Sequence, residues 1–312
     1  MNASKDVQTK LDVAVVGAPF LDLTFERLEA IPGVGEETLA RALHVCPGGT
    51  GMQAIAAARL GLTAGLAAPL GRKPLAQMVS RMIENEGVRL FDTEANEPAT
   101  HGTGVPVTAL LSTEAGVAMA SVLDGREPGP ADVEGIEARA VLVSLGRLHL
   151  SPPRAQVYVV TGTLELPRVG EDLLARLRGT RAFVLNAAEA AAVTGRAEPA
   201  AAAAWLASRG TTAVVTLGPG GAIAAEGDHI ERWTAPPVDA FDATGAGDLF
   251  AAAYVWADLG GASLRERLSW ACLYASLSVR SPTAFDGAVA RDVLLTAGRQ
   301  AGLQPPPGAR TP

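Results

Sequence analysis

The chain has 312 residues, 48% of them hydrophobic, and a formal net charge of −7 at pH 7. Its length and apolar fraction suit a large buried core and argue against an unstructured chain. Its negative charge disfavours nonspecific binding to nucleic acid, which needs a basic face to replace the counterions of the phosphates. No stretch approaches the roughly 20 apolar residues of a membrane span, and the amino terminus lacks the apolar centre of a secretion signal. We therefore expect a soluble, cytoplasmic protein that binds neither nucleic acid nor membrane.

The cysteines and histidines predict no structural metal site. Cys46 and Cys272 lie far apart and form no CxxC pair, so two buried thiols are expected in a reducing compartment. The four histidines share no ligand spacing, which argues against a structural zinc ion.

Short apolar runs alternate with helical patterns through most of the chain, beginning with the buried strand LDVAVVG at 11–17. Further strands are expected at 63–71, 140–146, 156–162, 181–186 and 211–218. Helices are expected at 47–61, 74–87, 169–179, 187–194, 198–209, 245–259, 263–280 and 289–301. Strands separated by helices indicate right-handed βαβ units and a mostly parallel sheet. The predicted fold class is therefore α/β.

Two segments interrupt this alternation, at about 20–45 and 101–125, where strand-like pieces follow one another with no helix between them. We expect them to form antiparallel strands that project from the main sheet as a small lid. The tail at 304–312 contains three prolines in series. Because such a run cannot continue a helix, this tail is expected to be disordered.

The strongest chemical signal lies in VDAFDATGAGDLFAAAYVWADLG, residues 238–260. The small residues at 245–247 leave three backbone N–H groups free to point into a cleft, where the helix dipole adds positive potential. Such a cradle suits the charge of a transferring phosphoryl group. Asp248, in the first helical turn, can orient and deprotonate an attacking hydroxyl. The alternative is a tight turn in which Asp248 only caps the helix.

Three further segments are weak alone and stronger together. In LNAAEAAAVTG, Asn186 and Glu189 share the first turn of a helix, where their oxygens suit Mg²⁺ and its waters; a capping box is the alternative. In VVTLGPGGA the glycines let the backbone approach a nucleotide, although GPGG is also an ordinary hairpin turn. In PGGTGMQAIAAARLG a double glycine at a helix start lets a substrate lie against the backbone.

In this order the segments resemble the signatures of the ribokinase family, also called the PfkB carbohydrate kinases. DATGAGDLF (242–250) is similar to the carboxy-terminal signature in full, and PGGTGMQAIAAARLG, NAAE and VTLGPGGA are similar to three other family motifs. The resemblance covers roughly residues 11–290. It implies one kinase domain over 1–303 with a three-layer α/β/α ribokinase-like fold and a small β-sheet lid over the substrate.

The resemblance also implies a role for each matching position. Asp248 would be the catalytic base, and the anion hole would be formed by Gly245, Ala246 and Gly247. The positions implied to bind ATP and to organise its phosphates, with Glu189 acting on Mg²⁺ through water, are Asn186, Glu189, Thr216, Gly218 and Gly221. Those implied to contact the substrate are Asp22, Gly48, Gly49 and Gln53. Those implied to hold a monovalent cation such as K⁺, which only some family members need, are Asp242 and Thr244.

Two departures from the family pattern leave the acceptor open between a sugar, a sugar acid and a nucleoside. Gln53 stands where the family usually has asparagine, and its amide reaches one methylene further. Arg72 and Lys73 stand where the family often has two aspartates. A solvated loop and a contact with an anionic substrate both fit this pair of cations. An exposed lid edge can pair with a second copy, so a homodimer through the lid is also an expectation.

The leading hypothesis is an ATP-dependent phosphotransferase that phosphorylates a hydroxyl of a small sugar-like substrate. The alternative, motivated by the two departures, is a non-catalytic ligand-binding or regulatory protein on the same scaffold. A dinucleotide-dependent oxidoreductase is disfavoured because no GxGxxG follows the first strand. A P-loop kinase is disfavoured because the chain contains no Gly-Lys pair.

Overall fold

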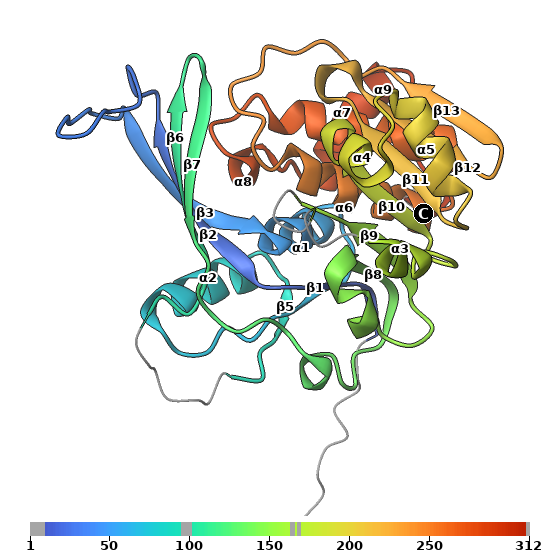
Figure 1. Cartoon of the computed structure of the whole chain (residues 1–312), viewed down its shortest axis with the longest axis horizontal. Coiled ribbons are helices and arrows are strands. Elements are labelled where there is room, and N and C mark those ends of the chain that lie inside the picture. The colour runs from blue at the N-terminus through green and yellow to red at the C-terminus, as the bar shows by residue number, and fades with distance from the viewer. Residues whose placement is uncertain (1–9, 95–101, 163–165, 167–169, 310–312) are drawn as a thin grey trace, which may run out of the picture.

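The main element of the computed structural model, which describes residues 10–94, 102–162, 166 and 170–309, is a large sheet (Figure 1). Its strands are β1 (Leu11–Val16), β4 (Ala64–Ala67), β5 (Arg89–Phe91), β8 (Ala138–Ser144), β9 (Gln156–Val160), β10 (Ala182–Asn186), β11 (Thr212–Thr216), β12 (Ala222–Glu226) and β13 (His229–Trp233). They lie in the order β13-β12-β11-β10-β9-β8-β1-β4-β5. All neighbours from β11 to β5 pair in parallel, and β12 and β13 extend one edge as an antiparallel hairpin.

The central strands are buried on both faces, as continuous apolar runs in a parallel sheet predict. In β1, Val13 and Val15 belong to the core on one face, whereas Ala14 and Val16 belong to the core on the other. This alternation follows from the two-residue period of a strand. Because both faces are apolar, helices must cover both.

Helices do cover both faces of the sheet (Figure 1). The helices that contribute to the larger core are α1 (Thr50–Arg59), α2 (Pro74–Asn85), α6 (Ala246–Leu259), α7 (Leu264–Ser278) and α9 (Arg291–Gln300). Those that contribute to the core on the other face are α3 (Glu171–Ala175), α4 (Ala187–Thr194) and α5 (Pro199–Ala207). The short α8 (Ala284–Gly287) packs against α7 and the second sheet. The prediction of a three-layer α/β/α fold with a mostly parallel sheet is confirmed.

A second, smaller sheet projects from the side of the main sheet (Figure 1). Its strands are β2 (Pro19–Glu26), β3 (Ala42–Gly49), β6 (Val107–Thr113) and β7 (Gly116–Val122), in the order β3-β2-β6-β7. The expectation of antiparallel strands needs one correction, because β2 and β6 pair in parallel. The chain leaves this sheet after β3, builds α1 to β5 in the main body, and returns in the same direction.

Two other expectations differ from the structure. Of the helix expected at 169–179, the described part, 170–179, is helical only over the five residues of α3. The tail, expected to be disordered from residue 304, is ordered as far as 309, because Trp270 Nε1 donates to Gln304 O (3.1 Å) and Gly308 N donates to Gly260 O (2.8 Å). Residues 310–312 lie outside the described part. None of the described helices is both long and apolar enough to cross a membrane.

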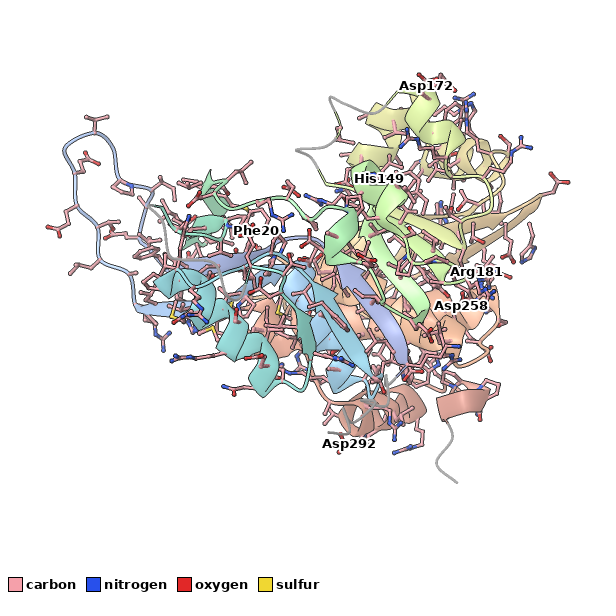
Figure 2. All side chains as sticks on the ribbon, turned by 90° about the horizontal axis from the view of Figure 1, so that it is seen from below. Phe20, His149, Asp172, Arg181, Asp258 and Asp292 are labelled. Carbon is pink, nitrogen blue, oxygen red and sulfur yellow. The ribbon has the colours of Figure 1, made fainter. Side chains whose placement is uncertain are left out.

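A buried carboxylate fixes the carboxyl end of α6, the helix whose other end forms the site described below. Asp258 accepts a hydrogen bond from Arg181 Nε at 2.6 Å, and Figure 2 labels both residues. Asp258 also accepts from Tyr158 Oη (2.6 Å), and Arg267 Nε lies 2.9 Å from its Oδ1. Burial opposes ionisation of Asp258, but the hydrogen bonds from Arg181 and Tyr158 outweigh it and lower the pKa of this carboxyl. These contacts tie α6 to β9, β10 and α7.

Replacing Asp258 by alanine is expected to destabilise the fold, because it leaves the two arginines without their shared carboxylate. The free energy of unfolding should fall by roughly 3 kcal/mol, as for other broken buried ion pairs. Urea denaturation measures it. Asp292→Ala, at an exposed position in α9, is the matched control and should change stability by about 0.5 kcal/mol or less. Equal stabilities for the two variants would contradict this role of Asp258.

Candidate active site

The residues predicted to form a site gather at the carboxyl ends of the parallel strands. The strand order reverses between β8 and β1, because the chain continues outward from β1 to β4 on one side and from β8 to β9 on the other. In open α/β sheets ligands bind at the carboxyl edge beside such a reversal. The second sheet and the amino end of α6 both lie at this edge (Figure 1).

A narrow pocket separates the second sheet from the amino end of α6. The sequence-predicted residues that line it are Asp22, Gly48, Gly49, Asp242, Thr244, Gly245 and Asp248. They come from β2, β3, the segment before α6, and α6 itself. Residues that lie more than 200 positions apart in the chain are thus brought into one pocket.

Asp22 lies against the backbone of the neighbouring strand β3. A Cβ atom added to Gly48 would stand 2.0 Å from Oδ2 of Asp22, so only glycine at this position leaves room for the carboxylate. Burial, and then the negative charge of Asp248, raise the pKa of Asp22 to about 7. Asp22 and Asp248 are therefore electrostatically coupled across the pocket.

The turn before α6 places Asp248 in the first turn of the helix. Gly245 has a φ of 78°, and a Cβ there would stand 2.7 Å from the Cβ of Ala284, so the turn requires glycine. The expectation of three free amides needs correction, because Ala246 N donates to Ala243 O (3.2 Å). Within the described part of the chain, the amides of Gly245 and Gly247 have no hydrogen-bond partner.

The carboxylate of Asp248 is held by one side chain. Gln53 Nε2 donates to Oδ1 of Asp248 at 2.7 Å. Burial raises the pKa of Asp248 to about 6, the hydrogen bond from Gln53 opposes this, and the charge of Glu189 adds to it. Gln53 is 5% exposed and does not line the pocket. In this structure the amide of Gln53 contacts Asp248, and its expected contact with a substrate stays a prediction.

The residues predicted to serve the nucleotide lie at the ends of β10 and β11. Asn186 and Thr216 are direct neighbours in the sheet. Asn186 Oδ1 accepts from Glu189 N (2.9 Å), and Glu189 Oε2 accepts from Asn186 N (2.9 Å), which is the capping box that the sequence left open. Gly218 and Gly221 have φ values of 56° and 90° in the turn after β11.

The donors predicted for metal ions are oxygen atoms. Asp242 Oδ1 accepts from Thr244 N (2.8 Å), and both residues line the pocket. In the described residues no group of three His, Cys, Asp or Glu side chains is placed to hold a metal ion. Mg²⁺ in phosphoryl-transfer sites is usually bound by one or two carboxylates together with substrate phosphates. The single buried carboxylate of Glu189 fits that pattern.

Among the apolar pocket residues that sequence reasoning missed are Met52 from α1, Leu110 from β6 and Phe285 from α8. Met52 takes the place that the sequence gave to its neighbour Gln53, because which of two adjacent residues faces the pocket depends on where α1 begins. The signal in the sequence that could have identified Met52 is its position three residues after the double glycine Gly48-Gly49. Arg72 and Lys73 do not line this pocket, which favours the solvated loop.

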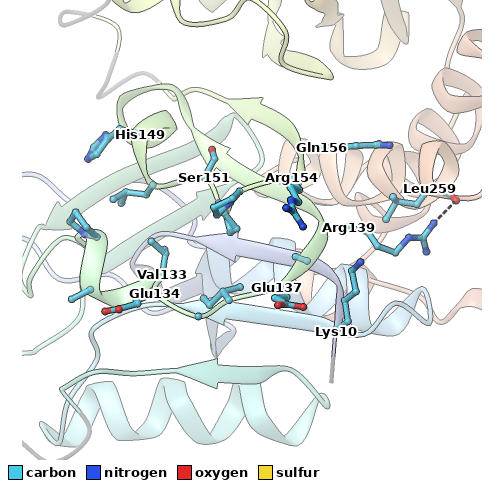
Figure 3. Close-up of a pocket in the computed structure, with 18 residues that line it drawn as sticks. Lys10, Val133, Glu134, Glu137, Arg139, His149, Ser151, Arg154, Gln156 and Leu259 are labelled. Carbon is cyan, nitrogen blue, oxygen red and sulfur yellow. Dashed lines mark hydrogen bonds between the residues drawn. The ribbon is translucent and has the colours of Figure 1, made fainter. Parts of the chain in front are cut away.

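A larger groove of about 1090 Å³ lies at the opposite edge of the sheet (Figure 3). It is formed by segments that precede β1, β8 and β9, and its charged side chains are mixed in sign: Lys10, Glu134, Glu137, Arg139 and Arg154. Arg139 is already paired with Asp12 at 2.9 Å. Because the cations are opposed by acids, this groove is poorly suited to a nucleotide triphosphate.

The parallel sheet, the second sheet and the carboxylate at the amino end of α6 define a ribokinase-like protein. The family model for the pfkB family carbohydrate kinases matches residues 155–289, which include Asn186, Asp242 and Asp248. The resemblance to the ribokinase/PfkB family is thereby confirmed. The matched segment is similar to this family of kinases, and the structures below show the same fold.

Several solved structures share the fold. Adenosine kinase from Sinorhizobium meliloti aligns with a TM-score of 0.75 and 20% identity over 94% of this chain and 100% of its own. Ribokinase from Thermotoga maritima aligns with a TM-score of 0.72 and 18% identity over 92% and 98%. Arabidopsis thaliana ribokinase, complexed with ribose and ATP, aligns with a TM-score of 0.68 and 21% identity over 92% and 98%. No curated protein matches the sequence.

The raised pKa of Asp22 predicts that this residue destabilises the fold as pH rises. The folded protein retains the proton of Asp22 up to about pH 7, whereas the unfolded chain loses it near the ordinary aspartate pKa of 3.8. The folded state therefore binds more protons between these values, and its stability falls as pH rises through them. Asp22→Asn cannot ionise, so it should be more stable than the wild type at pH 8, by roughly 4 kcal/mol.

Urea denaturation at pH 4 and pH 8 measures this difference. At pH 4 the difference should be small, because Asp22 is then neutral in the folded state and only about half ionised in the unfolded chain. The exposed replacement Asp292→Asn serves as control for the loss of one carboxylate. A stability difference between Asp22→Asn and the wild type that is the same at both pH values would contradict the raised pKa.

Proposed function

We propose that the chain is a kinase that transfers the γ-phosphoryl group of ATP, as its Mg²⁺ complex, to a hydroxyl of a small sugar-like acceptor. The observation that carries this proposal is the position of Asp248. Its carboxylate stands in one pocket with Asp22 and beside the unpartnered amides at the start of α6. A base, a hydroxyl-binding acid and a cradle for negative charge thus lie together.

Asp248 is suited to act as the general base. A pKa of about 6 leaves it mostly ionised at neutral pH and makes it a stronger base than an ordinary aspartate. Asp22, on the facing strand β2, is placed to accept a hydrogen bond from a second hydroxyl of the acceptor. Two carboxylates on opposite sides of the pocket would orient a polyol, so that one hydroxyl meets the base.

The phosphoryl group would be received at the amino end of α6. The N–H groups of Gly245 and Gly247, with Ala246 between them and the positive end of the helix dipole behind them, stabilise charge on the transferring group. Asn186 and Glu189 would organise the phosphates and the waters of Mg²⁺, which supplies charge neutralisation when bound. The nucleotide would lie along the ends of β10 and β11, against Thr216, Gly218 and Gly221. ATP use is supported by the ribokinase of this fold that was solved with ribose and ATP.

The charge of the pocket favours a neutral acceptor over a sugar acid. Three carboxylates line it, from Asp22, Asp242 and Asp248, and no lysine or arginine of the described segments does. An anionic acceptor would be repelled by these acids. The apolar side chains of Met52 and Leu110 suit the C–H face of a sugar or the base of a nucleoside. K⁺ would bind beside Asp242 and Thr244, whose hard oxygen donors suit such an ion.

The second sheet would act as the lid of a single kinase domain, because Asp22 reaches the pocket from it. Its edge strands are β3 and β7, and β7 exposes Met119 (59%) and Val122 (60%). An edge of this kind can pair with that of a second copy, so the homodimer remains a proposal. Cytoplasmic localisation is proposed on the sequence alone.

Asp248→Asn is expected to abolish phosphoryl transfer and to leave nucleotide binding intact. The amide keeps the shape of the side chain but cannot accept the proton, so turnover should fall by roughly a thousandfold. Steady-state release of ADP and titration with a fluorescent nucleotide measure the two properties. Asp292→Asn, far from the pocket, should behave as the wild type. Near-normal turnover of the Asp248 variant would show that the base is misassigned.

A screen of acceptors tests the proposed substrate class. Purified protein with MgATP, with and without K⁺, is offered matched neutral sugars, their sugar acids and nucleosides, and ADP release is recorded. We expect neutral acceptors to be phosphorylated at least tenfold more efficiently than their carboxylate counterparts. A preferred sugar acid would contradict the charge argument. Ligand binding without any turnover would instead support a non-catalytic binding protein.

A further inference from the structure

The close packing of α1 on α6 brings the amide of Gln53 to Asp248. Ala54 and Ala57 of α1 and Ala253 of α6 are buried in the same core, and these small side chains allow the helices to approach closely. Gln53 follows Met52, which lines the pocket, and points its own amide to α6 instead. Gln53 is thus a long polar side chain that is only 5% exposed and lies beside the proposed base, Asp248.

The hydrogen bonding of Gln53 is one-sided. Nε2 donates to Oδ1 of Asp248 at 2.7 Å, whereas Oε1 is buried and has no partner in the described residues. The reverse orientation of the amide would set Oε1 against the carboxylate, so the contact with Asp248 fixes the orientation. A buried amide that serves packing alone normally satisfies both ends. Gln53 therefore retains an unsatisfied oxygen in order to keep a donor on Asp248.

We propose that Gln53 is a positioning residue, whose amide holds Oδ1 of Asp248 and thereby keeps Oδ2 available for the acceptor hydroxyl. No described group donates a hydrogen bond to Oδ2 of Asp248. Hydrogen bonds from N–H groups to a carboxylate are strong and directional. One such bond can therefore select the rotamer of the base before the acceptor arrives. This inference rests on the proposed role of Asp248.

The same hydrogen bond affects the ionisation of the base. It stabilises the carboxylate form, in opposition to burial and to the charge of Glu189. Without it, the pKa of Asp248 should rise above its value of about 6. A larger fraction of the base would then be protonated, and activity would be lost at the acidic side of the profile.

The test is Gln53→Met, which keeps the length of the side chain and removes the donor. We expect kcat to fall roughly 10- to 100-fold, the effect of losing one hydrogen bond to a charged group. The KM for the acceptor should change less than twofold, because residue 53 does not line the pocket. The acidic limb of the profile of log kcat against pH should move to higher pH, because the hydrogen bond that lowers the pKa of Asp248 is lost. A merely structural role of Gln53 would not move this limb.

Gln156→Met is the matched control, because it makes the same change in β9, at the opposite edge of the sheet. It should leave kcat and its pH profile as in the wild type. If Gln53→Met does not fold, Gln53→Asn keeps the amide but shortens the side chain by one methylene, and the acidic limb should move in the same direction. Thermal melting and nucleotide titration establish that each variant is folded.

The outcomes separate this inference from the proposed function. A raised KM with an unchanged pH profile would make Gln53 a substrate contact, and wild-type behaviour would give it no role; either result overturns the inference. If Asp248→Asn is inactive while Gln53→Met is normal, only the inference fails. If Asp248→Asn keeps its turnover, the assignment of the base fails together with the inference.

Discussion

The placement of α6 is the constraint on which the site depends, because this helix is held firmly at both ends. At its carboxyl end Asp258 is bound by Arg181, Arg267 and Tyr158. At its amino end the turn at Gly245 packs against Ala284, and the segment before it is bonded to the backbone of α7 through Phe241 N and Val279 O (2.6 Å). A helix fixed in this way presents its free amides and its first-turn carboxylate at one defined place, which is what preorganised stabilisation of charge requires.

The pocket combines features that oppose stability. The charge of Asp248 raises the cost of ionising Asp22, the charge of Glu189 does the same to Asp248, and no described cation lines the pocket. The buried Oε1 of Gln53 adds an unsatisfied acceptor, a defect that costs about 1–3 kcal/mol. Such defects persist in a well-packed protein where function needs them. Their concentration around one helix end, rather than across the core, is consistent with a chemical role for that end.

Much of this arrangement could be predicted from sequence. Continuous apolar runs fixed the strands of the main sheet, and small residues before an apolar helix indicated the turn at Gly245 and the carboxylate of Asp248. The parallel pairing of β2 with β6 could not be predicted, because a strand's sequence does not encode the direction of its partner. The sequence predicted that Gln53 lines the pocket, whereas Met52 does. Adjacent residues of a helix point in directions about 100° apart, so a small error in where α1 begins changes which of them faces the pocket. The order of the tail was missed because it depends on Gly260, far away in the sequence, which leaves room for Pro306.

The two short connections of the second sheet have a mechanical consequence. β2 begins at Pro19, three residues after β1 ends, and β3 runs without a break into α1 at Thr50. The sheet therefore has little slack on this side, and any tilt of β2 and β3 would bend the chain at these two junctions. The junction at Thr50 is the first residue of α1. A tilt of the second sheet would therefore rotate the helix that carries Gln53. Closure of the second sheet over a bound molecule would then be coupled to the orientation of the Asp248 carboxylate through its hydrogen bond with Gln53.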